Sequence, residues 1–229
     1  MIISTYNNPA WLEKTLWGYL CQDKMADEII IADVAATADY LVFTDQDCVP
    51  RHDFLAVYNL MAKKGFFLSG GYFKLPLSIS KALQEEDVRD RQAFSLAWLR
   101  KQGLPFNFKC TKLVQKKWFT QLMNKITPTK ATWNGMNSSG WREDILAVNG
   151  FDERMQYGGE DREMGERLFH RGIRSRQIRY SAIVLHLDHG RPYVNEEAWK
   201  NNNAIRKVTK EERLQWTSWG IVKNSLCDR

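Results

Sequence analysis

The stretch from Tyr40 to Pro50 constrains the fold of this chain more than any other. An apolar run, Tyr40-Leu-Val-Phe-Thr, leads directly into two carboxylates, Asp45 and Asp47. Such a short run is typical of a strand buried on both faces, as in a parallel sheet. Ionised carboxylates are costly inside a sheet, so we place both at the open end of the strand, on one side of an extended chain. There they could hold a metal ion and, through it, a diphosphate; the alternative is a carboxylate pair that only shapes a turn.

Length and composition are those of a globular protein. The chain has 229 residues, of which 44% are hydrophobic and 26% charged, enough for one large domain. No apolar run approaches the ~20 residues of a membrane span, and the N-terminus lacks the basic region of a signal peptide. Four scattered cysteines show no metal-ligand spacing. We therefore expect a cytoplasmic protein with reduced thiols, and peripheral contact with the inner face of the membrane stays open.

The net charge of +6 is too small to indicate nucleic-acid binding, and no basic-aromatic motif accompanies it. Basic residues cluster at 112–117 and at 171–179. These clusters are either solvated surface or sites for a nucleotide diphosphate, an anionic acceptor or an acidic membrane surface.

The N-terminal region predicts a parallel βαβ unit. A strand at Ile2–Thr5 precedes a helix with Asn8 as N-cap and Pro9 at its first position, and a second strand follows at Glu28–Asp33. The next strand begins at Tyr40, although a parallel crossover needs a dozen or more residues. We therefore expect a segment to be missing between residues 33 and 34.

The remaining elements follow from apolar periodicity and from turn and cap residues. We expect a helix at 52–64, a strand at 66–75 interrupted by Gly70-Gly71, a helix-rich segment at 78–126, a turn region at 133–140, helices at 142–148 and 160–171, a strand at 181–187, and a last helix that begins with the capping box Thr209–Glu212.

A second candidate site is Gly158-Gly-Glu-Asp161, at the start of the predicted helix. Two glycines let the backbone approach a ligand and let a loop move, and an ionised Asp161 could take a proton from a hydroxyl. A carboxylate at a helix N-terminus is also stabilised by the helix dipole, so ordinary capping is the competing interpretation.

Two histidines and several aromatic residues complete the candidates. His186 and His189 lie just after a strand, where imidazole together with carboxylates suits Mn²⁺, whereas carboxylates alone favour Mg²⁺. Each histidine could equally be structural. Trp133 and Tyr157 flank the proposed site in sequence and could pack on a sugar ring, or they could pack in the core.

These motifs, in this order, resemble the inverting glycosyltransferases of family 2, which have the GT-A fold. The marks are Ile3-Ser-Thr-Tyr-Asn-Asn-Pro9, Glu28-Ile-Ile-Ile-Ala-Asp33 and Asp45-Gln-Asp47. The segment from Trp133 to His189, with Asn149-Gly-Phe-Asp-Glu153 and Tyr157-Gly-Gly-Glu-Asp161, resembles a galactosyltransferase-type region found in bacterial chondroitin-polymerase-like enzymes and animal β-1,4-galactosyltransferases. The resemblance covers about two-thirds of the chain. It implies a Rossmann-like α/β domain with a mostly parallel central sheet flanked by helices.

The resemblance also implies a role for each matching residue. It implies a domain at 1–190, divided into a nucleotide- and metal-binding half (1–75) and an acceptor-binding and catalytic half (76–190), with a helical extension at 191–229. The implied roles are nucleotide binding for Thr5, Tyr6, Asn7, Asp33 and Asp45; metal binding for Asp47, His186 and Asp45, with His189 as second choice; catalysis for Asp161 as base, with Glu160; and sugar contacts for Trp133, Asn137, Tyr157 and Gly159.

The function implied is transfer of a hexose or N-acetylhexosamine from a UDP-sugar, with Mn²⁺ or Mg²⁺, to a saccharide or a lipid-linked glycan in bacterial surface polysaccharide or glycolipid synthesis. Two alternatives remain open. A sugar-nucleotide nucleotidyltransferase would normally carry a glycine-rich, basic phosphate loop near the N-terminus, which Ser4-Thr-Tyr-Asn-Asn8 is not. A non-catalytic carbohydrate-binding protein would explain the aromatic residues without needing Asp161. The donor sugar, acceptor, linkage and oligomeric state do not follow from the sequence.

Overall fold

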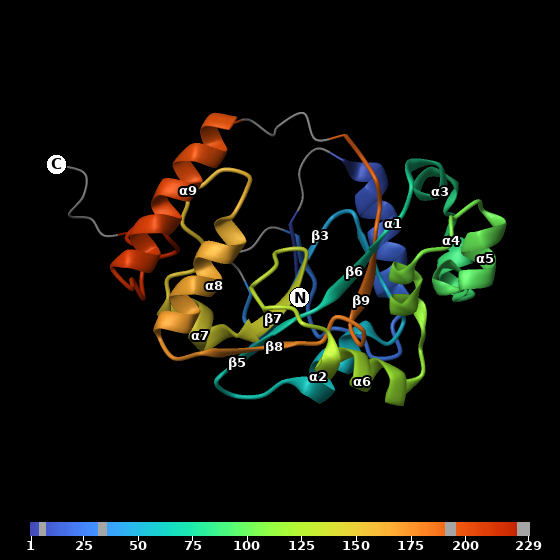
Figure 1. The fold of residues 1–229 in the computed structure, drawn as a ribbon, viewed down its shortest axis with the longest axis horizontal. Helices are drawn as coiled ribbons and strands as arrows, with labels where there is room; N and C mark the ends of the chain where they lie inside the picture. The colour runs from blue at the N-terminus through green and yellow to red at the C-terminus, as the bar shows by residue number, and fades with distance from the viewer. Residues whose placement is uncertain (5–7, 32–35, 191–195, 224–229) are drawn as a thin grey trace.

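A computed structural model describes residues 1–4, 8–31, 36–190 and 196–223. The chain forms a mixed α/β fold with a central, mostly parallel sheet flanked by helices (Figure 1). The break expected between residues 33 and 34 lies outside the described residues. So do the predicted nucleotide contacts Thr5, Tyr6, Asn7 and Asp33.

The central sheet has six strands in the order β2-β1-β3-β7-β5-β8. Strand β7 is antiparallel to both of its neighbours, and every other pair is parallel. Ile2 on β1 lies opposite Ile30 on β2, so the predicted parallel βαβ unit is confirmed. The strands are β1 (Ile2–Ser4), β2 (Ile30–Ile31), β3 (Tyr40–Asp45), β5 (Phe66–Ser69), β7 (Asn137–Trp141) and β8 (Arg174–Gln177).

A smaller sheet is formed by β4 (Cys48–Pro50), β9 (Ile183–His186) and β6 (Gly71–Lys74), in that order, with β9 in the middle. The chain passes from the large sheet to the small one twice, at Gln46-Asp47 between β3 and β4 and at Gly70 between β5 and β6. Asp47 therefore lies in a turn after β3. The prediction that Asp45 and Asp47 alternate along one extended strand is wrong, because the turn separates them.

Helices surround the sheets (Figure 1). Helices α7, α8 and α9 gather at one side of the fold, and α1, α3, α4 and α5 at the other. The Asn8 side chain caps α1 by accepting from the backbone N–H of Trp11, with Pro9 at the first turn, as predicted. The helices are α1 (Pro9–Leu20), α2 (Phe54–Met61), α3 (Leu77–Ala82), α4 (Glu85–Arg89), α5 (Leu96–Lys101), α6 (Lys117–Ile126), α7 (Arg142–Ala147), α8 (Glu160–His170) and α9 (Glu196–Glu211), with 3₁₀ turns η1 (Gln92–Phe94) and η2 (Phe108–Leu113).

The structure corrects the expected turn region at 133–140. Strand β7 (Asn137–Trp141) fills the middle of the large sheet instead. Asn, Ser and Gly have low β-propensity, but pairing with β3 and β5 on both sides overrides that preference. The small side chains also leave space for a neighbour: a Cβ on Gly140 would lie 3.1 Å from the Trp133 ring.

The expected start of the last helix is also wrong. Helix α9 begins at Glu196, and Thr209 lies inside it rather than capping it. The buried Thr209 hydroxyl donates to Glu163 on α8, 2.8 Å away. Thr209 therefore joins two helices and does not start one. Within the described part of the chain, every helix is too short or too polar to cross a membrane.

Candidate active site

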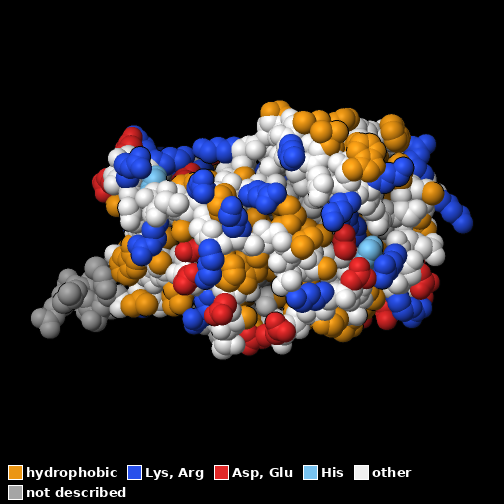
Figure 2. All heavy atoms as spheres, turned by 90° about the horizontal axis from the view of Figure 1, so that it is seen from below, with side chains coloured by type: hydrophobic (Ala, Val, Ile, Leu, Met, Phe, Trp, Pro, Cys, Tyr) orange, Lys and Arg blue, Asp and Glu red, His pale blue; other side chains and the backbone are white. Residues whose placement is uncertain are grey.

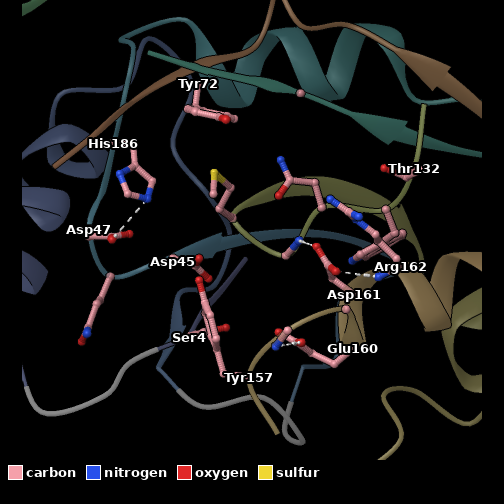
Figure 3. A pocket seen from close by; sticks show the side chains of 18 of the residues that line it. Ser4, Asp45, Asp47, Tyr72, Thr132, Tyr157, Glu160, Asp161, Arg162 and His186 are labelled. Carbon is pink, nitrogen blue, oxygen red and sulfur yellow. Dashed lines mark hydrogen bonds and ion pairs between the residues drawn. The ribbon is translucent and has the colours of Figure 1, made fainter. Parts of the chain in front are cut away.

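A cavity of about 940 Å³ opens beside the turn that follows β3. Side chains from both ends of the sequence line it, because the two sheets and α8 meet there (Figure 3). The predicted site residues that the structure describes lie on its wall, with the exception of Asn137; they are Asp45, Asp47, Trp133, Tyr157, Gly159, Glu160, Asp161, His186 and His189.

One end of the cavity brings together Asp47 and both histidines. The Asp47 Oδ2 atom lies 2.6 Å from Nε2 of His189 and 3.5 Å from Nε2 of His186. The two imidazole rings are stacked, with centroids 6.2 Å apart. Pairing of β4 with β9 sets this arrangement, since it places Cys48, next to Asp47, opposite His186.

The residue types of this group are those that bind a divalent first-row metal ion. One carboxylate oxygen and two imidazole nitrogens converge, and this mixed O,N set suits Mn²⁺ better than Mg²⁺. Among residues 1–4, 8–31, 36–190 and 196–223, no three His, Cys, Asp or Glu side chains are arranged so that they could hold a metal ion. Instead, His189 is hydrogen-bonded to Asp47, and a metal ion would replace that bond. His189, the second-choice ligand, lies closer to Asp47 than His186 does, so both histidines are candidate ligands.

The other end of the cavity holds Asp161 and Glu160, at the start of α8 (Figure 3). The Asp161 carboxylate accepts from the backbone N–H of Gly135 at 3.3 Å and of Arg162 at 2.6 Å. Burial raises the pKa of Asp161, although these bonds and the Arg162 charge oppose the shift. Burial also raises the pKa of Glu160, whose carboxylate accepts from the backbone N–H of Gly158 at 2.6 Å. Asp161 is thus a better proton acceptor than an exposed aspartate.

The glycine loop before α8 is held in place by α9. The Asn202 amide donates to the carbonyls of Gln156 and Gly158, each at 2.9 Å. Gly158 has φ 116°, and a Cβ there would lie 2.6 Å from Cε2 of Trp199, which lines the cavity. Helix α9 is therefore part of the site wall, whereas the sequence suggested only a helical extension. Trp199 and Asn202 were not predicted, because their contacts with this loop are distant in sequence.

Two predicted sugar contacts have buried side chains, although Trp133 is among the residues that line the cavity. The Trp133 side chain is fully buried in an apolar cluster, where it packs against Phe43 and Phe67. The Asn137 side chain is also fully buried: its amide donates to the carbonyls of Gly71 and Ala182. Asn137 therefore joins the two sheets.

Comparison with known proteins points to sugar transfer. Residues 124–190 match the family model described as the N-terminal domain of galactosyltransferase. This segment contains Asp161, His186 and His189. The match supports a glycosyltransferase. No curated protein matches the chain in sequence.

Similar solved structures include two glycosyltransferases. A mannosyltransferase from Pyrobaculum calidifontis, in complex with GDP-Man and Mn²⁺, is 15% identical with a TM-score of 0.48, over 93% of this chain and 62% of that one. This chain thus spans less than two-thirds of that protein. Glucosyl-3-phosphoglycerate synthase from Mycobacterium tuberculosis, in complex with Mn²⁺, UDP-Glc and phosphoglyceric acid, is 14% identical with a TM-score of 0.49, over 91% of this chain and 78% of that one.

Proposed function

We propose that this chain is a metal-dependent inverting glycosyltransferase of the GT-A type and of family 2. It moves a hexose or N-acetylhexosamine from a UDP-sugar to a hydroxyl of a saccharide or lipid-linked glycan. One observation carries the proposal: a single cavity has Asp47 with two histidines at one end and the half-buried Asp161 at the other (Figure 3). The family match at 124–190 supports the same class.

The donor binds at the end formed by the N-terminal strands. In this proposal Thr5, Tyr6, Asn7 and Asp33 contact the nucleotide, and Asp45 contacts the ribose and the metal. Asp47 and His189, with His186, hold the metal ion. When bound, a divalent ion offsets the negative charge that develops on the departing UDP.

The acceptor binds at the Asp161 end. The acceptor oxygen forms a bond to C1 of the sugar while the bond from C1 to the UDP oxygen breaks on the opposite side, so the anomeric configuration inverts. Asp161 takes the proton of the acceptor hydroxyl. Glu160 and Gly159 shape the acceptor position, and the Tyr157 ring offers an apolar face to a sugar.

The cellular role proposed is synthesis of surface polysaccharide or glycolipid in the bacterial cytoplasm. This role rests on the sequence resemblance alone. The donor half comprises residues 1–75, and the acceptor half begins at 76 and here includes α9, because α9 holds the glycine loop.

Release of UDP tests the proposal. Purified protein is incubated with a panel of UDP-sugars and Mn²⁺, with and without saccharide acceptors, and free UDP is measured. We expect Mn²⁺-dependent UDP release that a chelator stops. The anomeric proton couplings of the product, measured by NMR, report inversion or retention. Retention of configuration would exclude the single displacement with Asp161 as base.

A further inference from the structure

Two cations in the cavity wall have no acidic partner among the residues that the structure describes. Lys112, in η2, and Arg179, between β8 and β9, both line the cavity. The Lys112 ammonium donates to the carbonyl of Tyr72 at 3.1 Å and lies 5.1 Å from the centre of the Tyr72 ring. The nearest bond of the Arg179 guanidinium is a long one, 3.5 Å to the carbonyl of Lys130. Of the acidic side chains in the described ranges, none lies within 4.0 Å of either cation.

This pair is electrostatically costly without a bound anion. Burial lowers the pKa of Lys112, and the nearby charges of Arg179 and Lys109 lower it further. Burial also lowers the pKa of Arg179, and its Nε–H is buried with no hydrogen-bond partner in the described part of the chain. Burying two neighbouring positive charges away from water is unfavourable unless a negative charge binds beside them.

The surrounding chain strengthens the positive field. From Arg91 to Arg142, both included, the sequence has ten Lys or Arg residues and no Asp or Glu. This segment contributes Lys112 and also Thr132, which lies with Asp161 on one side of the cavity, across from His186 and Asp47 (Figure 3). Arg179 contacts Lys130, two residues before Thr132. The cation pair therefore extends from Tyr72 towards the side of the cavity that holds Asp161, the proposed base, where an acceptor must lie.

We infer that Lys112 and Arg179 form an anion subsite for a phosphate or carboxylate group on the acceptor. The inference rests on the proposed function and adds the chemical class of the acceptor: a sugar or lipid-linked sugar that carries a negative charge. A neutral acceptor would leave both cations unpaired at the site.

Calorimetric titration tests the subsite separately from catalysis. Glucose 6-phosphate, galacturonate and glucose are titrated into the protein with a chelator present, so that no metal site contributes. We expect the two anions to bind and glucose to bind more weakly. Lys112→Gln should weaken binding of the anions about tenfold or more, since a charge-assisted hydrogen bond is lost. Lys112→Arg should retain binding, and Lys116→Gln, which changes an exposed lysine outside the cavity, should have no effect.

Three results would overturn the subsite. The first is equal binding of the anions to wild type and Lys112→Gln, and the second is no binding of the anions to wild type. The third is weaker binding of UDP with Mn²⁺ to Lys112→Gln while anion binding is unchanged, which would assign the cations to the donor diphosphate. If the anions bind as expected but UDP does not bind with Mn²⁺, the proposed function fails and the anion subsite stands.

A different observation concerns the outer face of α6. Its inner side is fixed by polar bonds, in which the Asn124 side chain donates to the Ser181 hydroxyl and accepts from the backbone N–H of Tyr180, both at 2.8 Å. Its outer side carries Trp118, Leu122 and Ile126, which are 64%, 45% and 60% exposed. These residues recur every four positions and so form one stripe along the helix. These three apolar residues therefore face outward, whereas Phe119 on the same helix packs against Tyr180.

Lysines accompany this stripe. Lys116, Lys117 and Lys125 are exposed on or beside α6, within the acid-free segment that runs from residue 91 to 142. Figure 2 views the molecule from the side where α2 and α6 lie in Figure 1, and it shows hydrophobic side chains between Lys and Arg side chains on this face. An apolar stripe with flanking cations is complementary to the surface of a bilayer that contains anionic lipids.

We propose that α6 lies on a lipid bilayer with Trp118, Leu122 and Ile126 in the interface. Co-sedimentation with phosphatidylcholine vesicles, with and without phosphatidylglycerol, tests this. We expect binding that requires phosphatidylglycerol and falls several-fold in Leu122→Ser. The matched control is Val208→Ser on α9, since Val208 is an aliphatic residue of nearly equal exposure, 44%. Equal vesicle binding by the two variants would refute the proposal, and so would the absence of vesicle binding by wild type. Dimerisation of wild type in solution that is abolished by Leu122→Ser would also refute it.

Discussion

Replacing Asp161 by Asn tests the assignment of the base. The two side chains have nearly the same shape, but the amide does not accept a proton from a hydroxyl. General-base catalysis contributes about 10²- to 10⁴-fold, so turnover should fall by that factor. The carboxylate accepts two backbone N–H groups, from Gly135 and Arg162. An amide oxygen keeps one of these bonds, so we expect a loss of about 1 kcal/mol in the free energy of unfolding, partly offset because a half-buried charge is removed.

The assay combines UDP release with thermal unfolding. We expect Asp161→Asn to melt within a few degrees of wild type, because 1 kcal/mol shifts Tm by about 2–4 °C in a protein of this size. UDP binding in the presence of Mn²⁺ should be unchanged. Asp144→Asn is the matched control, since burial also raises the pKa of Asp144 but its side chain lies outside the cavity. Turnover of Asp161→Asn within threefold of wild type would refute the assignment.

The pH dependence follows from the same carboxylate. Asp161 acts as a base only when it is ionised, so activity is present above its pKa and is lost as the pH falls through it. Because burial raises this pKa, the loss should begin above the ~3.9 of an exposed aspartate. A raised pKa means that protonation of Asp161 favours the folded state, so titration of this group does not destabilise the fold as the pH falls. Thermal melts at each pH separate the loss of activity from unfolding.

Three further predictions concern the metal ligand, the glycine loop and the core of α8. Asp47→Ala should lose Mn²⁺-dependent binding of UDP, and unchanged affinity by calorimetry would exclude the ligand role. Gly158→Ala should lower the free energy of unfolding by about 1–3 kcal/mol because of backbone strain. The added methyl group would also collide with Trp199, which should lower stability and turnover further. Gly103→Ala, at φ 91° in open space, should show the strain alone. Arg167→Met should lower the free energy of unfolding, measured in urea, by about 3–5 kcal/mol, because it leaves the buried carboxylate of Glu163 without its ion-pair partner. A decrease below about 1 kcal/mol would contradict this prediction.

The sequence predicted best those elements whose signals are local. Asn8 and Pro9 start α1, the apolar run from Tyr40 forms β3, and α8 begins at Glu160 after the glycines. Gly172, with φ 91°, follows the end of α8 as a C-terminal glycine should. Each of these signals lies within one turn or one strand, so no distant contact was needed to interpret it.

Features that depend on distant contacts could not be predicted. Strand β7 consists of residues with low strand preference, and its neighbours β3 and β5 hold it in the sheet. Trp133 was expected beside a sugar, but Gly140 and two phenylalanines enclose it in the core. The hydrogen bond between His189 and Asp47 spans 142 positions, and Asn202 reaches Gly158 across 44. Spacing along the chain does not specify either contact.

The most direct test of the central claim is transfer from a nucleotide sugar. Wild-type protein is given a panel of UDP-sugars and Mn²⁺ with anionic and neutral saccharide acceptors, and UDP and product are measured by mass spectrometry. The account predicts at least one donor that yields UDP and a glycosylated product, stopped by a chelator and by Asp161→Asn. A folded protein that neither binds UDP with Mn²⁺ nor releases it from any donor would contradict the account.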